Sequence, residues 1–217
     1  MHDVIIIGTG PAGLQASMTL SRYRRRHLII SIPKLYRNRN ALEMHGFLTG
    51  DGTTPLEFIE QARGKLNEYR VVTFVDGRVV SSAKVGQVFE VKLEDGTEYA
   101  GRKLIIATGS MDFLLPINGV LLVYITLLTS GFAELWGTDI VHCVCCGGYE
   151  HRDKPCATIG LRSDMELDSA MKALSVASSV HLFPHLEDPD LVPLEMKKKT
   201  LLVRGTRYHD HAVQIHY

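Results

Sequence analysis

Neither sign of charge is in excess in this chain, whose 217 residues include 24 lysines and arginines and 24 aspartates and glutamates. The longest basic runs are short and lie at positions 24–26 and 197–199. A protein that binds nucleic acid needs a broad basic surface, which such runs do not supply. We therefore expect no nucleic-acid partner.

Cysteine is scarce, with four residues in the chain, and three of them lie in one cluster at positions 143–146. Such a cluster fits a redox or metal site in a reducing compartment better than structural disulfides. No secretory leader is expected, because the first apolar run, residues 4–7, reads as a strand. These features predict a cytoplasmic protein with a redox or metal site at the cysteine cluster.

Charged residues are absent from positions 113–133, a stretch about long enough to cross a bilayer. Proline, glycine and polar residues interrupt this stretch, so we expect a buried strand or a linker and no contact with a membrane. The part at 118–131 is interpreted as an atypical apolar insertion. It separates an expected nucleotide-binding domain at 1–117 from an incomplete second domain at 132–217.

A glycine-rich turn, residues 8–13 (GTGPAG), follows the aliphatic run 4–7 and precedes an expected helix at 14–23. An uninterrupted aliphatic run is typical of a buried parallel strand. In a dinucleotide-binding turn, Gly8 permits the tight bend, Gly10 allows the backbone to approach a pyrophosphate, and Gly13 lets the helix pack on the strand. The strand before the glycines and the helix after them are the context that favours this function.

An acidic residue is missing where such a site normally has one. The acid that holds the ribose hydroxyls lies about 20 residues after the turn, at the end of the second strand. Here the segment reads Ser31-Ile32-Pro33-Lys34, and the next acid is Glu43. Another group must hold the ribose, or the site binds its nucleotide weakly.

The remaining elements of the first domain predict an α/β, Rossmann-like fold. Thr54 is expected to cap a helix that begins at Pro55. Period-two segments at 71–75, 78–82 and 87–93 predict three strands of a β-meander. A buried strand then ends in Ala107, Thr108 and Gly109, small residues that admit a ligand close to the backbone. Strand, glycine turn, helix, meander and final strand together are typical of a flavoprotein with two dinucleotide-binding domains.

The cysteine cluster admits three interpretations. Cys143 and Cys146 form a Cys-x-x-Cys motif, in which one sulfur is attacked and the other resolves the mixed disulfide, and His142 could take or supply a proton. A zinc site built from His142, Cys143, Cys145 and Cys146 is the second interpretation, although adjacent ligands give poor tetrahedral geometry. Inert buried thiols are the third. Cys145 and Cys156 are expected to be structural.

A second βαβ unit is predicted after the cysteine cluster, with strands at 157–160 and 180–183 and a helix at about 164–177. Its turn has the single glycine Gly160, whereas a dinucleotide loop needs two or three. NADPH binding at this unit is therefore not the preferred expectation.

Six segments in chain order carry a resemblance to a known family: GTGPAG, YRN, MHG with the following LT, DG and P, ATG, GFAELWG, and HCVCCGGYE. Together they resemble the thioredoxin-reductase-like flavoproteins of fungi, which are class-II pyridine nucleotide-disulfide oxidoreductases, and above all dithiol oxidases of the gliotoxin type. The resemblance extends from residue 4 to about 150. It implies that the chain lacks the last FAD segment of these proteins.

The resemblance implies an FAD-dependent enzyme in which a flavin oxidises the Cys143–Cys146 pair and the resulting disulfide oxidises a small dithiol. Oxygen would reoxidise the flavin, the protein would be a homodimer, and the pathway would belong to fungal secondary metabolism. Alternatives are an inactive truncated member and an NADPH-dependent reductase. The residues expected along the FAD are Gly8, Gly10, Pro11, Ala12, Gly13, Tyr36, Arg37, Asn38, His45, Ala107, Thr108 and Gly109.

Overall fold

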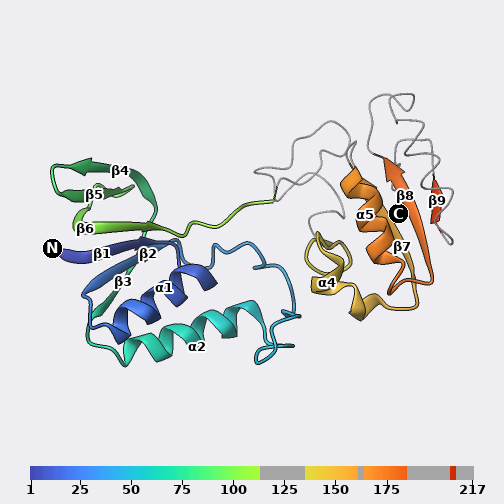
Figure 1. Cartoon of the computed structure of the whole chain (residues 1–217), viewed down its shortest axis with the longest axis horizontal. Helices are drawn as coiled ribbons and strands as arrows, with labels where there is room; N and C mark the ends of the chain where they lie inside the picture. The colour runs from blue at the N-terminus through green and yellow to red at the C-terminus, as the bar shows by residue number, and fades with distance from the viewer. Residues whose placement is uncertain (113–134, 161–163, 185–205, 209–217) are drawn as a thin grey trace. The chain divides into compact units, whose positions relative to one another are not determined.

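The computed structural model describes residues 1–112, 135–160, 164–184 and 206–208, which form two compact units (Figure 1). The first unit comprises Met1–Glu43 and Gly52–Gly137, and the second comprises Met44–Asp51 and Thr138–Tyr217. The predicted insertion at 118–131 and the whole uncharged stretch at 113–133 lie outside the described residues. No described helix is long and apolar enough to cross a membrane.

The first unit is built on a six-stranded sheet with the order β3-β2-β1-β6-β5-β4. Strands β3, β2, β1 and β6 are parallel, while β4 and β5 pair in antiparallel fashion and attach to β6. This is the α/β, Rossmann-like fold that the sequence predicts. The elements of this unit are β1 (His2–Ile7), α1 (Pro11–Arg22), β2 (His27–Ser31), α2 (Pro55–Asn67), β3 (Val72–Asp76), β4 (Val79–Val85), β5 (Val88–Leu93) and β6 (Glu98–Ile106).

Both faces of the central strands are buried, which explains their continuous aliphatic sequence. Side chains of β1 and β2 alternate between two cores. Ile6 and Ile29 pack with Leu14 of α1 and Leu66 of α2 in one core. On the other face, alternate residues of the same strands pack with residues of the meander, in a cluster formed by Ile5, Leu28, Ile30, Val91 and Leu93. The buried strand predicted at 4–7 is therefore confirmed.

The strand predicted at 71–75 exists, but its predicted place in the meander is wrong. β3 pairs in parallel with β2, so it is an edge strand of the main sheet. The Gly77 N–H donates to the Ser31 carbonyl at 2.8 Å and extends this ladder past Asp76. Asp76-Gly77 is thus no hairpin turn, and the meander consists of β4, β5 and β6. In this position Phe74 packs beside the core that α1 and α2 cover. This burial favours pairing with β2 over a hairpin with β4.

Helix α2 begins as predicted, with Thr54 as its N-cap and Pro55 as its first residue. The Glu57 N–H donates to the Thr54 side chain at 3.1 Å. The Thr54 N–H donates to the Glu57 carboxylate at 3.1 Å. These two bonds form a capping box, which satisfies two backbone donors at the helix start.

The second unit contains a parallel three-stranded sheet with the order β7-β8-β9. Helix α5 connects β7 and β8, as the predicted βαβ unit requires, and it ends at residue 173 rather than at 177. Ala170, Ala173 and Val180 form its core, against which Val144 and Cys156 pack. The elements of this unit are α4 (Val144–Gly147), η1 (Tyr149–His151), β7 (Pro155–Gly160), α5 (Asp164–Ala173), β8 (Ser179–Pro184) and β9 (Thr206–Tyr208).

A histidine lies in the core of the first unit, where sequence analysis predicted no polar group. His27 is fully buried, and its Nδ1 lies 2.8 Å from the Arg25 carbonyl, which can only accept a hydrogen bond. Nδ1 must therefore carry the proton. In the neutral ring that burial favours, Nε2 accepts from the Ser17 hydroxyl at 2.7 Å. Burial lowers the pKa of His27 below its ordinary value, and the Arg25 carbonyl opposes this only in part.

A lowered pKa in the folded state makes stability depend on pH. Below about pH 6.5 the unfolded chain binds the His27 proton and the folded chain resists it. The contribution of His27 to the unfolding free energy should therefore be constant above that pH. It should fall as the pH drops below that value. Urea denaturation between pH 5 and 8 measures the change, and His27→Leu should flatten it. His2→Gln is the comparison variant: burial also lowers the pKa of His2, so its removal should flatten the slope as well. An unchanged slope in His27→Leu would contradict this assignment.

Candidate functional site

The glycine turn brings the end of β1, the start of α1 and the end of β6 into close contact. Gly8 has φ +110°, and its N–H donates to the Ile30 carbonyl at 2.7 Å. A Cβ on Gly8 would lie 2.2 Å from the Ala107 carbonyl oxygen, and a Cβ on Gly13 would lie 1.9 Å from the Gly8 carbonyl oxygen. No other residue type fits either position without moving backbone.

Gly10 differs from these two glycines, because a Cβ there would meet no atom within 4 Å. Gly10 is the N-cap of α1, and Pro11 and Ala12, both exposed, are its first residues. The first N–H groups of a helix have no intrahelical partner and favour a negatively charged ligand. Space beside Gly10 therefore fits the predicted approach of a phosphate.

Residues after β6 lie next to this turn. The Ala107 N–H donates to the Ile7 carbonyl at 2.8 Å, so the ladder of β1 and β6 continues to the turn. Thr108 and Gly109 are exposed beyond it, and Gly109 has φ +70°. The structure thus brings together the predicted residues of the glycine turn and of the segment at 107–109.

The loop after β2 carries Tyr36, Arg37 and Asn38. Arg37 forms a bidentate pair with Asp112, with Nε to Oδ2 at 3.0 Å and Nη2 to Oδ1 at 2.5 Å. The Asn38 carbonyl accepts from the Ala41 N–H at 3.0 Å within a turn of the loop. Sequence analysis missed Asp112, because nothing in the sequence indicates which acid meets Arg37.

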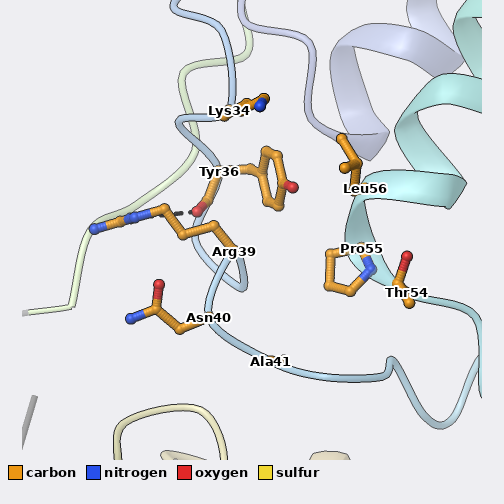
Figure 2. A pocket seen from close by; sticks show the side chains of 8 residues that line it. All are labelled: Lys34, Tyr36, Arg39, Asn40, Ala41, Thr54, Pro55 and Leu56. Carbon is orange, nitrogen blue, oxygen red and sulfur yellow. Dashed lines mark hydrogen bonds between the residues drawn. The ribbon is translucent and has the colours of Figure 1, made fainter. Parts of the chain in front are cut away.

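A pocket of about 350 Å³ lies between this loop and the start of α2. Figure 2 shows the Tyr36 ring turned towards Pro55 and Leu56, whereas the Arg39 side chain runs away from them. An Arg39 Nη1–H donates to the Tyr36 carbonyl at 3.3 Å. Among the predicted cofactor residues, Tyr36 lines this pocket. Its full lining is Lys34, Tyr36, Arg39, Asn40, Ala41, Thr54, Pro55 and Leu56.

His45 lies in the second unit, together with the segment that follows the cysteine pair. Its Nδ1 is 3.5 Å from Asp51 Oδ2, and its Nε2 is 3.5 Å from Glu150 Oε1. The Gly46 N–H donates to Asp51 at 2.8 Å and, together with His45, lowers the pKa of that carboxyl group. The described contacts of His45 are thus with two carboxylates, which sequence analysis did not predict.

The two thiols of the Cys-x-x-Cys motif lie side by side at the start of α4. The Cys146 Sγ is 2.8 Å from the Cys143 Sγ, and neither cysteine is in a disulfide. A disulfide bond measures about 2.05 Å, so a short movement of either side chain closes the pair. His142, which is exposed, precedes Cys143 directly. Within the described residues, no three His, Cys, Asp or Glu side chains are arranged to hold a metal ion.

The other two cysteines differ from each other. Cys156 is half-buried against the core of the second unit, and burial raises the pKa of its thiol, as expected of a structural residue. Cys145 is exposed, so its predicted structural role is wrong. The short helix α4 directs its packing residue, Val144, to the core and leaves Cys145 on its solvent side.

The sequence matches the model of the pyridine nucleotide-disulphide oxidoreductase family over residues 2–161. The chain belongs to this family. Its members include FAD-binding flavoproteins of the thioredoxin reductase type, which agrees with the fold and with the motifs of this chain.

Three relatives illustrate the similarity. A probable thioredoxin reductase of Arthroderma benhamiae is 33% identical over 73% of this chain and 38% of its own length. The thioredoxin reductase tcpT of Claviceps purpurea is 37% identical over 69% of this chain and 44% of its own. An oxidoreductase structure from Agrobacterium tumefaciens has a TM-score of 0.81 and 30% identity, covering 96% of this chain and 64% of that one. The chain thus spans less than half the length of the two fungal relatives.

The residues of the first unit fit the phosphate part of an FAD. Gly8, Gly10 and Gly13 form a turn with open space at the middle glycine and the start of a twelve-residue helix behind it. The part of the site that would bind the ribose lacks the usual carboxylate, because Ile32 follows the last residue of β2. FAD would therefore be held mainly through backbone groups of this unit.

Two glycine substitutions separate packing from ligand binding. Gly13→Ala should lower the unfolding free energy by about 3 kcal/mol or more, because its methyl group would collide with a backbone carbonyl. Gly10→Ala should lower that free energy by about 1 kcal/mol or less, since its methyl group meets no atom and alanine is only a poorer N-cap. Gly10→Ala should nonetheless weaken FAD binding. Urea denaturation without FAD and fluorescence titration with FAD measure the two effects. Equal destabilisation by both substitutions would contradict the assigned roles.

Proposed function

We propose that this chain is the FAD-binding and thiol-bearing part of a thiol-disulfide oxidoreductase that oxidises a small-molecule dithiol. The observation that supports this most directly is the 2.8 Å separation of the Cys143 and Cys146 sulfurs in a member of a disulphide oxidoreductase family. Secondary metabolism is the proposed setting, because the motifs resemble those of gliotoxin-type dithiol oxidases. A cytoplasmic location suits reactive thiols, and a homodimer is the commonest symmetric assembly.

The proposed reaction begins with Cys143 and Cys146 joined in a disulfide. A substrate thiolate attacks one of these sulfurs, and the other cysteine leaves as a thiolate. The second substrate thiol then attacks the mixed disulfide, which forms the substrate disulfide and releases the remaining cysteine. Two electrons and two protons have then moved from the substrate to the cysteine pair. FAD, when bound, supplies the acceptor for the two electrons, and oxygen is its proposed oxidant.

His142 and the helical backbone have supporting roles in this proposal. His142, beside Cys143, is proposed to hold the proton that passes to or from the Cys143 sulfur. Packing of Val144 against Ala170 and Ala173 fixes the start of α4 and with it the spacing of the two thiols. Preorganised thiols exchange faster, because no chain entropy is lost when the disulfide closes.

Serine substitutions test the cysteine pair. Cys143→Ser and Cys146→Ser should each lower dithiol oxidation by at least about 100-fold, because each removes one of two sulfurs that act as a unit. Cys156→Ser is the matched control, since that thiol packs in the core and should leave turnover within about threefold. Oxygen consumption with dithiothreitol and added FAD measures the rates. Full activity in both variants of the pair would overturn the proposal.

A further inference from the structure

Tyr149 is an exposed aromatic side chain close to the thiol pair, and the proposed reaction gives it no role. Its exposed fraction is 64%, and it follows Cys146 by three residues. The backbone between them is right-handed helical, since α4 continues through Gly148 (φ −78°, ψ −30°) into η1. A three-residue spacing on such a backbone places two side chains on the same side. The Tyr149 ring therefore lies on the side of the segment that carries the Cys146 thiol.

The Arg152 guanidinium packs on one face of the Tyr149 ring and restricts its orientation. The guanidinium carbon lies 4.6 Å from the centroid of the Tyr149 ring, within cation–π distance. An Arg152 Nη1–H also donates to the Tyr149 carbonyl at 3.2 Å, which fixes the cation relative to the backbone. One ring face is covered by the guanidinium, so the large exposed area belongs mostly to the other face and the edge.

An aromatic ring that is oriented in advance and open on one face is suited to stacking. Aromatic rings stack in an offset arrangement that strengthens binding by roughly two- to tenfold beyond simple burial, whereas a flexible aliphatic chain gains no such contribution. Because Arg152 has already restricted the ring, little rotamer entropy is lost when a ligand stacks on it. A compound with its sulfurs attached to a flat ring could place them near Cys146 while its ring lies on Tyr149.

We propose that Tyr149, oriented by Arg152, is a stacking platform that makes the Cys143–Cys146 pair select ring-bearing dithiols and disulfides over aliphatic ones. This inference rests on the proposed function only in taking the cysteine pair as the group that meets substrate. The favoured class is a planar aromatic ring that carries the sulfur atoms. Tyr149 is thus a specificity-determining residue with no part in the electron transfer itself.

Thiol-disulfide exchange tests the platform without any flavin. The reduced 217-residue chain is mixed with 4,4′-dithiodipyridine or with bis(2-hydroxyethyl) disulfide. A cysteine thiolate attacks one reagent sulfur and releases a reagent thiol, and the second cysteine then closes the Cys143–Cys146 disulfide and releases the other. All variants are made in a Cys145→Ser background, because Cys145 is also exposed. Stopped-flow rates are compared between variants for each reagent, so that the reagents' own reactivities cancel.

Tyr149→Leu should slow the reaction with the aromatic reagent about fivefold and leave the aliphatic reagent within about 1.5-fold. Tyr149→Phe keeps the ring and should retain the parent rates. Arg152→Gln should give a smaller, equally selective loss. Tyr23→Leu is the control, since Tyr23 is 74% exposed and lies in the first unit.

Equal slowing of both reagents by Tyr149→Leu would mean that Tyr149 only supports the fold of this segment, and it would overturn the platform. Absence of an effect on either reagent would overturn it as well. The result is independent of the oxidase proposal. A chain that shows the selective loss and yet never oxidises a dithiol with FAD would refute the proposed function and leave the platform standing.

Discussion

The close approach of three backbone segments at the glycine turn is the constraint on which the first unit depends. The Gly8 carbonyl occupies the space that a Gly13 side chain would need, and the Ala107 carbonyl occupies the space that a Gly8 side chain would need. These contacts bring β1, α1 and β6 together at one end of the sheet. The site expected for the phosphates is therefore a consequence of backbone packing, and its chemistry is that of N–H groups and a helix start rather than of charged side chains.

Side-chain chemistry is concentrated in the second unit instead. The paired thiols follow an exposed histidine, and a short helix fixed by one apolar contact holds them. The segment 44–51 belongs to the same unit, and through His45 it meets Glu150, four residues beyond the second thiol. A segment from the first half of the sequence thus supports the redox segment from the second half.

Local signals in the sequence were sufficient to predict much of this structure. The aliphatic run at 4–7, the glycine spacing and the Thr54-Pro55 cap depend on near neighbours, and each appears where it was predicted. The errors concern partners distant in sequence. Whether residues 72–76 pair with β2 or β4 is decided by burial against two helices, and the partners of Arg37 and His45 are decided by how loops fold back. The exposure of Cys145 likewise depends on which side of α4 packs on α5.

The central claim is that this chain passes electrons from a dithiol through its cysteine pair to FAD. The most direct measurement is the visible absorption spectrum of the chain after incubation with FAD and gel filtration, followed by anaerobic titration with dithiothreitol. The account predicts that the flavin bands stay with the protein and bleach on addition of the dithiol, and that Cys146→Ser prevents the bleaching. A chain that carries flavin which the dithiol cannot bleach, or one that retains no flavin at all, would contradict it.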